Sequence, residues 1–533
     1  MAEIRAAEGA AAPRFAWTPR RIIAATLIGL CLSVFAVGYF YVYWRRADLD
    51  IVLVYQGLRF NEGLPQTFYD HTGYLYYLLL GWWYGLLHAV GLLPVDTVSA
   101  LPPAADRAAY DATWTALVRA GRVFSLLCAC AYVGAFAWLV RQAFRDGKAA
   151  AFAAFALACA VATQARVLRT EMISGAFVAF ALILTLLAIQ APRALRRAGL
   201  MALAGGCAAL AMEMKVQAVI PLLAVPAVAL SVGRRSESGR EPTGWPLAAG
   251  LAVAGAAAAY AAWALVFQHA FSRDAAGVYP PIANLPDGLY QAMLLAWPLI
   301  AIAVYAAVWR TQASDALAAA GALTLGAGVG ALLLLVRLQT PNVLAIAHPI
   351  EHMFGFAAQF HPEMGEDVAG GFAGRLLAAA WDSVATHLFV LHPTNRPALL
   401  AEWFALGAIY VAWRRGERAV VYQASVLILA AWGMDAIFAV RSLKKYYLLY
   451  SDPFLILAAA RMAAHFPQVW AAPRTRHFVI WGGVAAILWA HVAPIRWALS
   501  KRQEVQACLL LPDYIADVAF PYCPPPPKRA GSL

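Results

Sequence analysis

Long apolar runs, each close to the length of a membrane-spanning helix, dominate the pattern of this chain. A helix needs about 20 mostly apolar residues to cross a bilayer, and about thirteen windows meet that length. These windows lie at 22–43, 114–140, 149–165, 172–190, 199–213, 216–233, 245–271, 289–309, 316–338, 398–413, 419–440, 446–463 and 478–498. Polar residues gather between them, so the pattern predicts an all-α polytopic membrane protein.

The composition excludes the soluble classes of protein. Of the 533 residues, 62% are hydrophobic and 13% are charged, whereas about 25% are charged in an average soluble domain. So little charge does not cover the surface of a water-soluble globule of this size. Soluble enzymes, disordered tails and secreted disulfide scaffolds are therefore excluded.

Basic residues indicate how the windows are oriented. Arg14, Arg20 and Arg21 precede the first window, and the window ends in aromatic residues from Tyr39 to Trp44, as expected of a spanning helix that enters from the cytoplasm. Basic residues recur in the short loops on the same side, namely Arg141, Arg145, Lys148, Arg193, Arg196, Arg197, Arg234, Arg235, Arg414, Arg415 and Arg418. Basic loops on one side of a membrane therefore account for the net charge of +12, and this charge does not indicate binding to nucleic acid. We expect a bacterial inner-membrane protein with a cytoplasmic N-terminus and a periplasmic C-terminus.

This topology divides the chain into three parts. A cytoplasmic segment covers 1–21, a membrane domain covers 22–498, and an external tail covers 499–533. The membrane domain carries two long external loops, at 44–113 and 339–397. In the tail, Cys508 and Cys523 form either a disulfide, which an external compartment permits, or two free thiols.

The first external loop carries the most informative residues. Asp48 and Asp50 lie at the mouth of the first window, where carboxylates are costly near lipid and tend to be functional; alternatively, they merely end the helix. The stretch from Val54 to Phe60 predicts a short amphipathic helix, and the aromatic stretch 74–87 predicts a second. We expect both helices to lie in the membrane interface.

The order of residues in this loop resembles the first external loop of GT-C glycosyltransferases. The resemblance rests on Asp48-x-Asp50, Tyr55, the segment 59–63 and Asp70-His71 before an aromatic helix. The family uses polyprenyl-phosphate sugars and includes protein O-mannosyltransferases and aminoarabinose transferases. Members usually have Asp-Glu at the start of the loop and Pro after the His or Lys, where this chain has Asp-Ile and His-Thr. Asp48 and Asp50 therefore compete for one catalytic position, and the distance to Tyr55 favours Asp50.

Further segments resemble the family in chain order. Arg119 and Arg122 open the second window, Arg169-Thr-Glu171 is similar to the second external loop, and Lys215 matches a Lys of the next outer hairpin. The late segment with Arg441, Lys444 and Lys445, followed by Asp452-Pro453, resembles a basic motif near the last windows. The order of spans and loops resembles the family over most of the chain, and recognisable sequence motifs cover about a fifth of it.

The resemblance implies an inverting transfer from a polyprenyl-phosphate sugar to a hydroxyl of a lipid, glycan or protein. One carboxylate accepts the proton of the attacking hydroxyl, and cations stabilise the leaving phosphate. Asp50 is then the expected base, with Asp48 its competitor, and Glu171 beside Arg169 holds the acceptor or orients the base. The expected phosphate ligands are Lys444, Lys445, Arg441 and Lys215. The alternative for the basic residues is that they snorkel at a helix end.

The second long loop contains His348-Pro-Ile-Glu351-His352, which has the spacing of an inverted zinc-protease motif. Pro349 restricts that segment to a first helical turn, so we expect no zinc site. We expect His348 and His352, like Tyr55, Asp70 and His71, to contribute to substrate binding, or the loop to be a lid without chemistry. No cofactor is obligatory, although the Asp48–Asp50 pair leaves room for a divalent cation.

Two other classes of function compete with a glycosyltransferase. A transporter or lipid flippase predicts charged or broken helices near the bilayer midplane, whereas nearly all charges here lie at the ends of windows. A polysaccharide polymerase or ligase shares the polytopic pattern. Such an enzyme would carry Arg-rich external loops without Asp-x-Asp directly after the first window.

Overall fold

The structure is a computed structural model. It describes residues 18–43, 50–68, 72–232, 241–271, 288–308, 311–353, 371–390, 396, 398–440, 447–466 and 515. Within these ranges the regular secondary structure is helical and no β-strand occurs. A helix satisfies its backbone hydrogen bonds internally, as a segment in hydrocarbon requires. The all-α expectation is confirmed.

The helices follow one another along the chain with short connections. The α-helices are α1 (Pro19–Ala36), α2 (Asp50–Glu62), α3 (Tyr74–Ala89), α4 (Arg107–Phe144), α5 (Gly147–Val161), α6 (Thr170–Gln190), α7 (Ala194–Met214), α8 (Val219–Val232), α9 (Trp245–Ala262), α11 (Leu289–Val308), α12 (Ala313–Leu332), α13 (Thr340–Ala347), α15 (Gly371–Phe389), α16 (Leu399–Arg414), α17 (Arg418–Ala439) and α18 (Leu448–His465). Short 3-10 or π turns join or extend several of them, at η3 (Gln164–Arg166), η4 (Val216–Ala218), η5 (Trp263–Phe267), η6 (Gln268–Phe271) and η7 (Leu333–Arg337).

Among the described residues, 8 helices are long and apolar enough to cross a membrane. They are α1, α4, α6, α7, α9 with its extension to Phe271, α11, α12 with its extension to Arg337, and α17. Each predicted window except 478–498, which lies outside the described residues, falls on a helix. Several of those helices are short, since α5 has 15 residues and α16 has 16. The membrane character is confirmed, and the number of thirteen spans stays a prediction.

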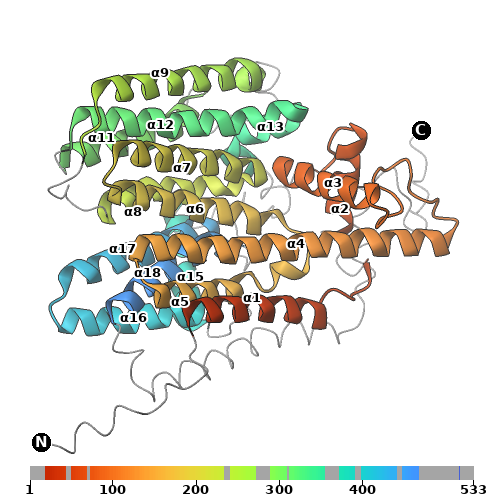
Figure 1. The fold of residues 1–533 in the computed structure, drawn as a ribbon, viewed down its shortest axis with the longest axis horizontal. Coiled ribbons are helices and arrows are strands. Elements are labelled where there is room, and N and C mark those ends of the chain that lie inside the picture. The colour runs from red at the N-terminus through yellow and green to blue at the C-terminus, as the bar shows by residue number, and fades with distance from the viewer. Residues whose placement is uncertain are drawn as a thin grey trace, which may run out of the picture.

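The spanning helices lie roughly side by side, and α2 and α3 gather beside one end of the bundle (Figure 1). The long helix α4 has 38 residues, or about 57 Å at about 1.5 Å per residue, against about 30 Å for the hydrocarbon core. Its N-terminal part therefore extends past the bundle and lies next to α2 and α3.

Helices α2 and α3 pack closely because each has a glycine at the contact. A Cβ at Gly81 would lie 3.0 Å from the carbonyl oxygen of Gly57. Asn61 donates hydrogen bonds to the carbonyl oxygens of Gly81 (2.9 Å) and Asp96 (3.1 Å). Both predicted helices of this loop are therefore confirmed, but the amphipathic expectation is wrong for α2. Every residue from Asp50 to Phe60 is buried, because protein surrounds this helix.

The segment expected as a second external loop, 339–397, contains two helices, α13 and α15. Helix α15 has 19 residues and packs against α17. Its apolar positions follow the 3.6-residue period, which a reading of the segment as a loop overlooks. Helix α15 carries His387, whose side chain is buried.

Helix α12 lies between α7 and α9, at one side of the bundle (Figure 1). A Cβ at Gly326 would overlap the carbonyl oxygen of Ala202 in α7, and a Cβ at Gly321 would lie 2.6 Å from the backbone nitrogen of Ala252 in α9. Lipid tails are as apolar as leucine, so helices in a membrane associate largely by such close packing. The glycines of α12 allow its backbone to approach both neighbours.

We predict that Gly326→Leu separates α12 from α7 and destabilises the protein by about 1–3 kcal/mol or more, the usual cost of overpacking. Thermal unfolding of the purified protein in detergent measures the effect. Gly250→Leu in α9 is the matched control, because a Cβ there has no neighbour within 4 Å. Equal melting temperatures for the two variants would contradict the packing argument.

Candidate functional site

Asp50 begins α2 and is completely buried against Arg122 of α4, which is 1% exposed. Its Oδ2 accepts hydrogen bonds from Nε (3.0 Å) and Nη2 (2.6 Å) of Arg122, and its Oδ1 accepts one from the Leu168 amide (3.0 Å). Arg122 Nη1 also donates to the carbonyl oxygens of Tyr39 (3.2 Å) and Tyr41 (2.7 Å). One ion pair therefore joins the segment after α1, the start of α2, the middle of α4 and the loop before α6.

Because this pair holds four segments of the chain together, we call Asp50 and Arg122 the anchor. A general base needs an oxygen within about 2.6–3.2 Å of the hydroxyl that it deprotonates. Asp50 is completely buried and already accepts three hydrogen bonds, so an acceptor hydroxyl reaches its remaining acceptor site only if the surrounding side chains move. The role of base that the resemblance implies stays a prediction for Asp50, and its competitor Asp48 lies outside the described residues.

Three other predicted site residues lie next to this anchor. Arg169 Nη1 donates to Glu171 Oε1 at 3.5 Å, and Lys215 Nζ lies 3.9 Å from the same oxygen. All three side chains are buried. Glu171 sits in the first turn of α6, where the helix dipole favours a negative charge. The loop residue Leu168 connects this cluster to Asp50, so residues from three separate segments form one chain of contacts.

Tyr55 is buried in α2, within the loop that the sequence predicts to be external. Its hydroxyl accepts a hydrogen bond from Arg59 Nη1 at 2.9 Å, and Arg59 Nε donates to the carbonyl oxygen of Pro65 at 2.8 Å. These bonds hold the turn that follows α2. The other predicted residues of this group lie outside the described residues, namely Asp70, His71, Arg441, Lys444 and Lys445.

His348 caps the C-terminal end of α13, and His352 lies in the short helical segment 349–353 that follows. His348 Nε2 contacts the carbonyl oxygen of Ala270 at 2.9 Å, and its Nδ1 contacts Gln291 at 3.2 Å. Both ring nitrogens are therefore engaged with protein groups. Among the described residues, no group of three or more His, Cys, Asp or Glu side chains is placed to hold a metal ion.

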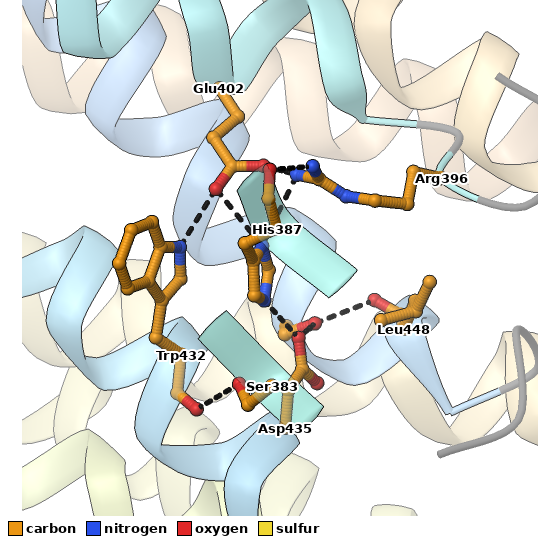
Figure 2. A network of polar contacts seen from close by, with 8 residues as sticks. Ser383, His387, Arg396, Glu402, Trp432, Asp435 and Leu448 are labelled. Carbon is orange, nitrogen blue, oxygen red and sulfur yellow. Dashed lines mark hydrogen bonds and ion pairs between the residues drawn. The ribbon is translucent and has the colours of Figure 1, made fainter. Parts of the chain in front are cut away.

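A polar network between α15, α16 and α17 was not predicted. His387 Nδ1 lies 2.9 Å from Glu402 Oε1, and His387 Nε2 lies 2.9 Å from Asp435 Oδ2 (Figure 2). Arg396 pairs with Glu402 and donates to the backbone oxygen of His387. Trp432 donates to Glu402 Oε1 at 2.7 Å and stacks on the imidazole with ring centroids 5.2 Å apart. The signals in the sequence were Glu402 and Asp435, two ionisable residues that lie inside the apolar windows 398–413 and 419–440.

This network is desolvated, since the side chains of His387, Glu402 and Asp435 are at most 1% exposed. Burial lowers the pKa of the Arg396 guanidinium to about 10, and the charges of Asp452 and Asp435 oppose that shift. Ser451 at the start of α18 donates to Asp435 Oδ2 at 2.9 Å. The network therefore ties α15, α16, α17 and α18 together, close to the C-terminal end of α17 and the start of α18.

Comparisons with known proteins identify no relative of this chain. No family model matches the chain, and neither a curated protein nor a solved structure matches it.

We predict that Arg122→Leu destabilises the protein by about 3–5 kcal/mol, because it leaves a buried carboxylate without its counter-charge. Thermal unfolding in detergent measures the loss. The matched control is Arg141→Leu, an exposed position on the same helix, which should stay within about 0.5 kcal/mol of the parent. If Arg122→Leu unfolds at the parent temperature, the anchor is not stabilising.

We predict acid sensitivity at Glu351. Burial raises the pKa of this carboxyl, but hydrogen bonds with His348 and Tyr290 outweigh burial and leave the pKa below its usual value of 4.5. The stabilisation by Glu351 is therefore fully present above pH 4.5 and is lost as the pH falls through the lower folded-state value. Unfolding measured between neutral and acid pH should show a shallower loss of stability for Glu351→Gln, and identical slopes would refute the assignment.

Proposed function

We propose that this membrane protein is a glycosyltransferase that moves a sugar from a polyprenyl-phosphate carrier to an acceptor hydroxyl, at the membrane face where α2 and α3 lie. One observation carries the proposal. Asp50, the pair Arg169 and Glu171, and Lys215 come from three segments that resemble GT-C motifs, and they meet in one chain of contacts at one end of the bundle. We further propose that this end faces the periplasm of a bacterial inner membrane.

The arrangement supplies the charges that such a transfer needs. The leaving group is a phosphate, which departs as an anion and needs cations more than it needs an acid. Among the described residues, we assign Lys215 to the leaving phosphate. The resemblance implies that Arg441, Lys444 and Lys445 are further phosphate ligands. The attacking hydroxyl needs one carboxylate as base, and we propose that this base is Asp50, with Asp48 as its competitor.

Glu171 has a different part in this proposal. Its Oε1 lies 3.5 Å from Arg169 Nη1 and 3.9 Å from Lys215 Nζ, so in this proposal it orients both cations for the donor phosphate. The acceptor is a lipid, a glycan or a protein. No step of this mechanism requires a metal ion.

We predict that the variant lacking the base loses transfer by about 10²–10⁴-fold while it still binds the sugar lipid. The parent, Asp50→Asn, Asp48→Asn and Glu171→Gln would be purified in detergent. Binding and turnover would be measured with a panel of polyprenyl-phosphate sugars.

Because Asp50 is also an anchor, thermal stability must be measured beside turnover. Arg122→Gln is the control, since it weakens the anchor and keeps the carboxylate. A loss of transfer in Asp50→Asn beyond that of Arg122→Gln assigns the base to Asp50, and a loss confined to Asp48→Asn moves it there. If no sugar lipid binds the parent, the proposal is wrong and a lipid transporter becomes the better hypothesis.

A further inference from the structure

A cavity of about 640 Å³ lies between α6, α7, α8, α9, α11 and α12. Its walls are mainly Ala, Leu, Val, Met, Ile and Pro side chains, and its ionisable residues lie at the two ends. Arg197 in the first turn of α7 and Glu213 in the last turn both line it. At about 1.5 Å per residue these positions are about 24 Å apart, close to the about 30 Å of the hydrocarbon core. The cavity therefore has the length and polarity of a lipid chain.

One end of the cavity is closed by groups that satisfy one another. Arg197 Nη2 pairs with Asp315 Oδ1 at 2.8 Å and donates to the carbonyl oxygen of Glu241 at 2.6 Å. The Thr243 amide donates to Asp315 Oδ1 at 3.0 Å. The polar groups at this end are therefore satisfied without a ligand.

The other end differs, because its acceptor atoms have no donors. Glu213 is 1% exposed, and within the part of the chain that the structure describes neither of its carboxylate oxygens has a hydrogen-bond partner. Gln291 is 8% exposed; its Nε2 contacts His348 Nδ1, and its Oε1 has no described partner. Burying a carboxylate without a partner is costly, and unsatisfied buried groups are rare in native proteins. The two carboxylate oxygens of Glu213 and Gln291 Oε1 therefore favour a ligand that donates hydrogen bonds at this end of the cavity.

We propose that this cavity holds one hydrocarbon chain of a membrane lipid whose primary ammonium head group donates to Glu213 and Gln291. Charge complementarity selects the head group. An anionic head group without an amine would face the Glu213 carboxylate, and a trimethylammonium group has no N–H to donate. The site goes beyond the proposed transfer reaction, since Asp50, Arg169, Glu171 and Lys215 do not line this cavity.

Native mass spectrometry of the purified full-length protein tests the proposal with dioleoyl phosphatidylethanolamine, phosphatidylcholine and phosphatidylglycerol, which share their tails. We expect phosphatidylethanolamine to bind at least tenfold more tightly than the other two lipids. Stepwise N-methylation should keep binding until the last N–H is lost, and this series needs no variant that might misfold. Free ethanolamine should not compete, because it lacks the chain.

Glu213→Gln should remove the preference among head groups and keep the binding of the tail. Glu417→Gln is the matched control, since Glu417 pairs with His465 and does not line the cavity. Equal binding of the three lipids to the parent would overturn the proposal, as would a Glu213→Gln variant that keeps the preference. The transfer assay does not enter these measurements, so the two proposals can fail separately.

Discussion

The buried ion pair of Asp50 and Arg122 determines how the segment that contains α2 and α3 joins the bundle. Removing two charges from water is expensive, and their attraction compensates only when the remaining donors and acceptors are also satisfied. Here the carboxylate accepts bonds on both oxygens, and the guanidinium also donates to backbone carbonyl oxygens after α1. The pair therefore holds α2 and the loop before α6 in one arrangement, and the contact chain to Glu171 and Lys215 depends on it.

A second constraint comes from packing in lipid. Without a hydrophobic force between helices, close backbone contact requires small residues, and α12 meets this need with glycines that face α7 and α9. The same group of helices, joined by α6, α8 and α11, surrounds the apolar cavity. Gly205 of α7 belongs to both features, because a Cβ there would overlap the carbonyl oxygen of Leu323 in α12 and the residue also lines the cavity.

The buried carboxylates show two different environments. Asp50 faces an arginine, and Glu402 faces both Arg396 and His387. These groups are parts of the scaffold, because the protein supplies their counter-charges. Glu213 receives no such partner within the described residues. That contrast, rather than burial alone, separates a carboxylate that holds the fold from one placed to meet a ligand.

Apolar windows and their flanking charges determined much of this protein from the sequence alone. The all-α membrane class and the places of most spanning helices follow from hydrophobic length, which is a local property. The sequence also pointed to Asp50, Glu171 and Lys215 as charges at helix ends.

Only the tertiary structure decided what these charges contact. Arg122 lies 72 positions from Asp50 along the chain, and the histidine network joins α15, α16 and α17 through side chains that no periodic pattern relates. The same holds for the cavity, whose walls come from helices that lie far apart along the chain. Hydrophobic periodicity specifies that a face is buried, but which residue it meets depends on how the helices pack, and that is a property of the whole fold.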